Sequence, residues 1–162
     1  MKALAHQYLR PQQRVLPKFF RPKLTVDKRS ACQIIIWDMV TNFANGSATQ
    51  DELLDWIESG LTCAHMARLL KADGEVFTDA AMNILAELLD SHEALLARYR
   101  RHQPQPRIGF SEPELQTARD AAAVMVVLLE MDRHGIALRA AQWCARQMHV
   151  LRTTGQLAKY FF

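Results

Sequence analysis

Few side chains in this sequence of 162 residues have the types and spacing that metal or acid–base chemistry requires. Glu130 and His134 lie four residues apart, as do Cys144 and Met148, and either pair could supply two ligands to a metal ion. Neither pair has a third ligand nearby in the sequence. Glu130 and His134 are equally suited to an ion pair near a helix end. We therefore predict no metal site and no cofactor.

Nucleophilic catalysis has one weak candidate, the thiol of Cys63 with the imidazole of His65. Residues two apart on a helix point in different directions, so these two side chains could not pair directly. His92 lies on an apolar seam, where a histidine is more often structural than a catalytic base. Phosphate-binding loops, nucleophile elbows and zinc-protease motifs are missing from the sequence. We therefore predict no catalytic residue and no enzymatic activity.

The composition is that of a globular protein, with 49% hydrophobic and 23% charged residues. The longest apolar run, residues 121–129, is less than half of the roughly 20 residues that a membrane span needs. Residues 1–7 become polar before a signal-peptide core could form. Cys32, Cys63 and Cys144 are widely spaced and odd in number, which indicates no disulfide framework and fits a reducing cytosol. We expect a soluble, cytoplasmic protein with these cysteines in or near its core.

Charge divides the chain into a basic arm, residues 1–24, and a helical bundle domain, residues 25–162. Residues 1–30 hold eight basic residues and one acidic residue, whereas residues 31–162 hold twelve basic and sixteen acidic residues. Such an arm could bind nucleic acid, an acidic protein or an anionic lipid surface, or fold back on the acidic body of its own chain. The candidate binding residues are Arg10, Arg14, Lys18, Arg21, Lys23, Lys28 and Arg29.

Apolar residues recur at helical spacing in five segments separated by residues typical of helix ends. The predicted N-caps are Thr25, Thr49, Thr78 and Ser111. The fold prediction is an all-α, single-domain bundle of helices at about 26–44, 49–72, 79–101, 112–133 and 137–153. Segment 112–133 is apolar on all sides, so we expect it to be the central helix. The predicted core includes Ile35, Met39, Leu85, Leu88, Val124, Leu128 and Met148.

One stretch, residues 50–70, has a motif-like pattern built from Gly60, Leu61, Thr62, Met66 and Leu69. It resembles the helix-turn-helix family of DNA-binding proteins, in which the glycine sits in the turn. The resemblance implies a DNA-contacting unit that includes Gly60, Thr62, His65 and Arg68. A helix kinked or broken at Gly60 explains the same residues, because the bulk of Trp56 would separate two closely crossing helices.

Aromatic residues near both ends of the chain suggest an interface, because they are costly to leave in water. The candidate apolar interface consists of Phe19, Phe20, Tyr99, Tyr160, Phe161 and Phe162. These residues cover either the chain's own core or a second copy, and a two-fold homodimer is the expected form of the latter. We predict a small regulatory or adaptor protein that acts by protein binding or self-association. The alternative is a DNA-binding transcriptional regulator that uses residues 50–70 and the arm.

Overall fold

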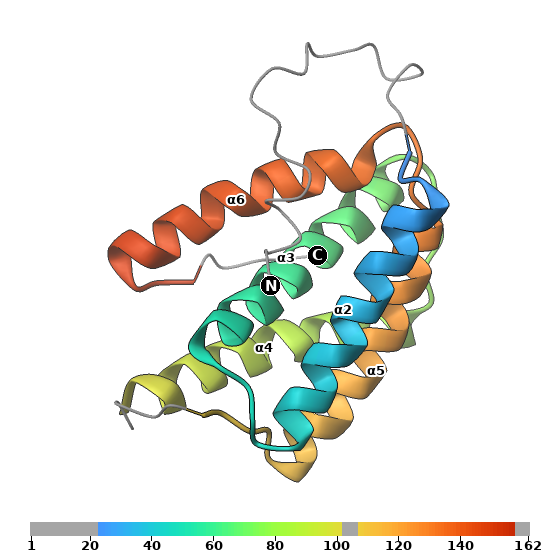
Figure 1. The fold of residues 1–162 in the computed structure, drawn as a ribbon. Helices are drawn as coiled ribbons and strands as arrows, with labels where there is room; N and C mark the ends of the chain where they lie inside the picture. The colour runs from blue at the N-terminus through green and yellow to red at the C-terminus, as the bar shows by residue number, and fades with distance from the viewer. Residues whose placement is uncertain (1–22, 102–106, 158–162) are drawn as a thin grey trace.

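Five helices make up most of the chain in the computed structural model, which describes residues 23–101 and 107–157. They are α2 (Val26–Ala44), α3 (Gln50–Ala72), α4 (Asp79–Arg101), α5 (Glu112–Glu130) and α6 (Ile136–Thr154) (Figure 1). The predicted all-α fold is confirmed. A single antiparallel bridge between Ala48 and Ile108 joins two loops and is the one strand-like pairing in the described ranges. Within the same ranges, no helix has the length and apolar character needed to cross a membrane.

Side chains at the helix starts accept hydrogen bonds from N–H groups that have no partner inside the helix. Thr25 and Thr78 each accept one from the backbone N–H three residues later, at 3.3 and 3.2 Å. Thr49 and Glu52 form a capping box, in which the Thr49 hydroxyl accepts from Glu52 N–H and the Glu52 carboxylate accepts from Thr49 N–H. α5 begins with a second capping box at Ser111. These local contacts explain why the predicted starts of α2 to α5 agree with the structure to within one residue.

α3 is the central helix of the bundle and packs against α2, α4, α5 and α6 (Figure 1). Its residues 55–64 are all buried. The prediction that segment 112–133 is central is therefore wrong. α5 occupies an outer position against α2 and α4, and its Val127 is 53% exposed. The apolar run of α5 overstated its burial, because burial depends on how many neighbours can approach a helix and not on its composition alone.

Gly60 lies in the middle of α3 and not in a turn. The helix runs without interruption over Gln50–Ala72, so the helix-turn-helix and the broken helix predicted for residues 50–70 are both wrong. The glycine instead permits the close crossing of α3 and α4. A Cβ at this position would lie 2.3 Å from Cε1 and 2.9 Å from Nε2 of His92. The His92 ring therefore packs directly on the backbone of α3.

The turn between α5 and α6 joins three parts of the chain. α5 ends at Glu130, three residues before the predicted end, and the buried carboxylate of Asp132 follows. This carboxylate accepts hydrogen bonds from the backbone N–H of Leu24 at 2.6 Å and of Ala137 at 2.8 Å. Arg133 forms ion pairs with the two carboxylates that follow α3. The start of α2, the end of α3 and the start of α6 therefore meet at one end of the bundle.

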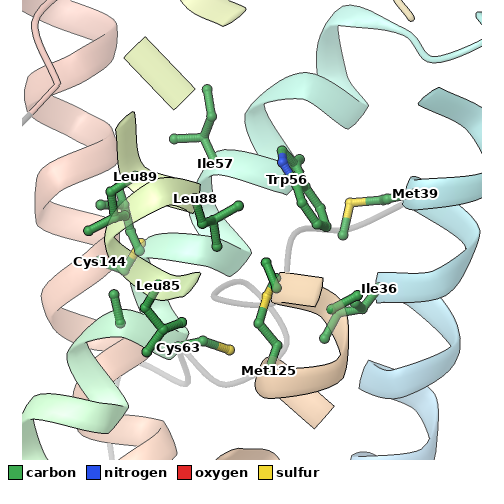
Figure 2. Packing of buried hydrophobic residues seen from close by; sticks show 14 of the residues in the cluster. Ile36, Met39, Trp56, Ile57, Cys63, Leu85, Leu88, Leu89, Met125 and Cys144 are labelled. Atoms are coloured by element: carbon green, nitrogen blue, oxygen red, sulfur yellow. The ribbon is translucent and has the colours of Figure 1, made fainter. Parts of the chain in front are cut away.

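Aliphatic, aromatic and sulfur-containing side chains fill the core, and Figure 2 shows Trp56 of α3 among them. Five of the predicted core residues are buried: Met39, Leu85, Leu88, Leu128 and Met148. Ile35 and Val124 are only partly buried, because their neighbours Ile36 and Met125 take the inward positions (Figure 2). All three cysteines are free and buried, as predicted.

Candidate functional site

The side chains considered for nucleophilic catalysis are not brought together. Cys63 is 1% exposed, and burial raises the pKa of its thiol far above the ordinary range. The thiol is therefore protonated near neutral pH, which is the unreactive form. The ring of His65 stacks on Trp143 of α6, with ring centroids 4.3 Å apart.

His92 is enclosed between α4 and α3 and has no exposed surface. Neither of its ring nitrogens has a hydrogen-bond partner among the described residues, and burial lowers its pKa to about 3. The ring meets Trp56 edge-on, with centroids 6.4 Å apart. Because the neutral ring packs against Gly60 and Trp56, we interpret it as a structural residue of the α3–α4 crossing.

The two pairs considered as metal ligands have other contacts. Glu130 accepts a hydrogen bond from Gln33 at 3.4 Å, and His134 lies beyond the end of α5 with a φ of 51°. Cys144 is buried with Met148 in the core, and its thiol donates to the backbone carbonyl of Glu58 at 3.3 Å. No group of three or more His, Cys, Asp or Glu side chains in the described ranges is arranged to hold a metal ion.

Only three of the predicted arm residues, Lys23, Lys28 and Arg29, lie within the described residues. Lys23 is exposed, and the other two belong to the first turn of α2. The remaining four, Arg10, Arg14, Lys18 and Arg21, lie outside the described residues. Their binding role stays a prediction.

The predicted apolar interface is represented in the structure by Tyr99 alone, because Phe19, Phe20, Tyr160, Phe161 and Phe162 lie outside the described residues. Tyr99 is half-buried and packs against the core. The seam of α4 that precedes it is buried inside the monomer, including Leu85, Leu88 and Leu95. This seam is therefore not available as an exposed dimer contact. The homodimer itself stays a prediction.

The four helix-turn-helix candidates separate into two pairs on α3. Gly60 and Thr62 are buried, and the Thr62 hydroxyl lies beside the thiol of Cys144. His65 is partly exposed and Arg68 is exposed, and both belong to the side of α3 that faces α6. The structure thus assigns the second pair to a surface shared by α3 and α6.

The outward side of α6 is basic. The helix contains three arginines and no acidic residue, and its buried side is apolar. Arg139 and Arg146 are seven residues apart, so they project from the same side of the helix. Neither forms an ion pair with a described carboxylate. Beside them, Gln142, Arg146 and His149 line a shallow hollow with Ala145 and Val150.

Burial and neighbouring positive charges both act on the imidazole of His65. Its pKa falls to about 4, first because it is partly buried and then because Arg68, Arg139 and Arg146 are close. A cation beside the ring disfavours the protonated form. The resulting surface, which we call the α6 basic face, consists of His65, Arg68, Arg139, Trp143 and Arg146.

Sequence reasoning missed Arg139, Trp143 and Arg146. A signal was present, because no acidic residue follows Asp132 and the two arginines lie one heptad apart. Their meeting with His65 and Arg68 depends on the packing of α6 against α3. No protein-family model, curated protein or solved structure matches the chain.

Proposed function

We propose that this protein is a non-enzymatic adaptor or regulator that binds an acidic segment of another protein along the α6 basic face. The observation that carries the proposal is the stack of the His65 ring on the Trp143 ring between α3 and α6. Arg68 lies one turn after His65 on α3, and Arg139 and Arg146 lie one turn before and one turn after Trp143 on α6, so their charges act on the same surface. Arginine and tryptophan are among the side chains most enriched at the energetic centres of protein interfaces. An arginine fork binds a carboxylate through two hydrogen bonds, and this favours an acidic partner.

The charge of the described part of the chain favours a protein partner over nucleic acid at the α6 basic face. The described residues hold 14 basic and 17 acidic residues, so the body of the protein would repel a long polyanion. A short acidic segment meets only the local positive face. The hollow beside Arg146 adds apolar contact from Ala145 and Val150, which suits a peptide with mixed acidic and apolar side chains.

The proposal places the protein in a reducing compartment, the cytoplasm. The support is that Cys32, Cys63 and Cys144 are all free thiols buried in the fold.

Fluorescence anisotropy with two labelled probes tests the proposed function. One probe is a 14-residue peptide of alternating glutamate and leucine pairs, and the other is a 14-base-pair DNA duplex. We expect the peptide to bind the full chain more tightly than the duplex does, with an affinity that falls as salt rises. The double substitution Arg139→Glu, Arg146→Glu should weaken peptide binding at least about tenfold, because both charges are reversed at the contact.

A matched control moves the same charge change to other helices. Arg101→Glu with Arg119→Glu reverses two exposed arginines of α4 and α5 and should leave peptide affinity within about twofold. Equal weakening by both double substitutions would show that only net charge matters, and would contradict the proposed site. Tighter binding of the duplex, lost with Arg139→Glu and Arg146→Glu, would assign the face to nucleic acid instead.

A further inference from the structure

The outward side of α2 carries a row of side chains that no other described helix covers. α2 packs against α3 and α5 with its buried side. On the opposite side, residues recur at spacings of four, three and four, which align them on one face. They are Ser30, Ile34, Trp37 and Thr41, all of them exposed, and we call them the α2 seam.

The two central members of the α2 seam are large and apolar. Ile34 is 61% exposed and Trp37 is 43% exposed. At one end of the seam, the hydroxyl of Thr41 donates to the backbone carbonyl of Trp37 at 2.9 Å. The polar group of Thr41 is therefore already paired within the helix, and the seam can be covered by an apolar surface without leaving that hydroxyl unsatisfied.

α5 extends this apolar surface beyond α2. The two helices are antiparallel and lie side by side (Figure 1). The amide of Gln33 donates a hydrogen bond to Glu130 at 3.4 Å, which places the end of α5 beside the middle of α2. Val127 lies one turn before Glu130 and is also exposed. Large apolar side chains that are exposed together, in contrast to single ones, mark interaction surfaces, and tryptophan is typical of their centres.

We propose that the α2 seam pairs with the α2 seam of a second copy of this chain, antiparallel and about a two-fold axis. The first argument is that the seam reads the same in both directions: one hydroxyl residue, two large apolar residues, one hydroxyl residue. An axis through its midpoint sets Ile34 against Trp37 of the second copy. The same axis sets Ser30 against Thr41 of the second copy. One patch then covers its own copy, as a two-fold interface requires.

The second argument is that this pairing brings no like charges of α2 together. The seam is uncharged, and the acidic residues of α2 are Asp27 and Asp38, both exposed. In the antiparallel register Asp27 lies opposite Ala44 of the second copy. Asp38 lies opposite Gln33 of the second copy, whose amide can donate a hydrogen bond. A parallel pairing would set each aspartate against its own counterpart, where like charges repel.

Sedimentation of the full chain between about 1 and 100 µM tests the pairing. We expect the mass to rise with concentration from the 18.5 kDa of one chain toward that of two chains. Ile34→Lys puts a charge beside the axis in each copy and should raise the dissociation constant at least about tenfold. Val76→Lys is the matched control, because Val76 is even more exposed but lies between α3 and α4. It should change the constant by less than about twofold.

Engineered cysteines test the antiparallel register. A mixture of Ser30→Cys and Thr41→Cys chains should form a disulfide-linked dimer in oxidised glutathione, because these positions lie opposite each other across the axis. Ser30→Cys alone should not cross-link, since the two copies of residue 30 would lie about 16 Å apart along the helices at 1.5 Å per residue. The unaltered chain is the background control, because its own cysteines are all buried.

A single species of 18.5 kDa at every concentration would overturn the proposal, and so would a dimer that Ile34→Lys leaves intact. Equal weakening by Val76→Lys would show that added charge matters and the α2 seam does not. Cross-linking of Ser30→Cys with itself would assign a parallel pairing and contradict the register. Circular dichroism of each variant checks that the helices are retained. None of these outcomes depends on the partner of the α6 basic face, because no residue of α6 is changed.

Discussion

α3 and α5 are helices of similar apolar content that lie in different environments. α3 is enclosed through residues 55–64, even though that stretch includes the polar side chains of Asp55, Glu58 and Thr62. α5 contains the longest apolar run of the sequence, yet its Val127 is 53% exposed. The two helices show that an enclosed helix is defined by its neighbours and can carry buried charge.

Small residues explain how α3 accommodates so many neighbours. Gly60 receives the imidazole of α4, and the nearby Ser59, Cys63 and Ala64 are also buried. α5 has buried alanines too, but they all belong to the inward side of an outer helix. Close approach on several sides therefore distinguishes α3 from α5, and substitutions can measure this difference between the two helices.

The largest expected difference between the two helices is in the stability lost on truncation, which Leu61→Ala on α3 and Val127→Ala on α5 compare. Leu61 is 1% exposed, so its truncation leaves a cavity and should lower the free energy of unfolding by about 2–5 kcal/mol. Val127→Ala removes half-exposed methyl groups and should change it by less than about 0.5 kcal/mol. Urea denaturation followed by circular dichroism measures both values. Similar losses for the two variants would contradict the central position of α3.

The sequence is informative about α3 and α5 where local contacts decide the structure. The Thr49 capping box and the Ser111 capping box mark their starts, because each depends only on residues three apart. The central position of α3 could not be predicted in this way. It depends on residues far apart in the chain, such as the contact between Gly60 and His92.

At the candidate site, too, features set by local sequence could be predicted, and features set by packing between distant helices could not. The charge of α6 is visible in the sequence, since Arg139 and Arg146 lie in a segment without acidic residues. Their grouping with His65 and Arg68 is not visible, because it requires α6 to pack on α3. The turn assigned to Gly60 failed for a related reason. A glycine that permits a helix crossing has the same sequence signal as a glycine that ends a helix.

The next effect concerns the close approach at Gly60. Gly60→Ala should lower the free energy of unfolding by about 1–3 kcal/mol, because the new Cβ would overlap the buried His92 ring. This loss should appear although alanine favours a helix over glycine by about 0.5–1 kcal/mol. Ala123→Gly at an exposed position of α5 measures that helix propensity alone. Chemical denaturation of both variants gives the comparison.

The double variant Gly60→Ala, His92→Ala identifies the cause of the loss. Removing the imidazole removes the overlap, so the two substitutions together should cost less than the sum of their separate effects. Additive losses would show that the glycine is needed for some reason other than its contact with His92.

The smallest expected effect is a dependence of stability on pH that arises at the same crossing. His92 has a pKa of about 3 in the folded protein, because it is buried, against 6.5 in the unfolded chain. Between these values the unfolded state binds a proton that the folded state does not, so stability falls as the pH falls.

From pH 7 to pH 5, the loss due to His92 should be about 1–2 kcal/mol at roughly 1.4 kcal/mol per pH unit below 6.5. His92→Leu removes this titration and should flatten the pH dependence by that amount. The pKa of His65 is also lowered, so part of the dependence remains in the variant. Urea midpoints at pH 5 and pH 7 for both proteins measure the difference.

An unchanged pH dependence in His92→Leu would mean that the imidazole accepts a proton in the folded protein. Water would then reach the α3–α4 crossing, and α3 would be less enclosed, and closer to the outer helix α5, than the burial of its side chains indicates.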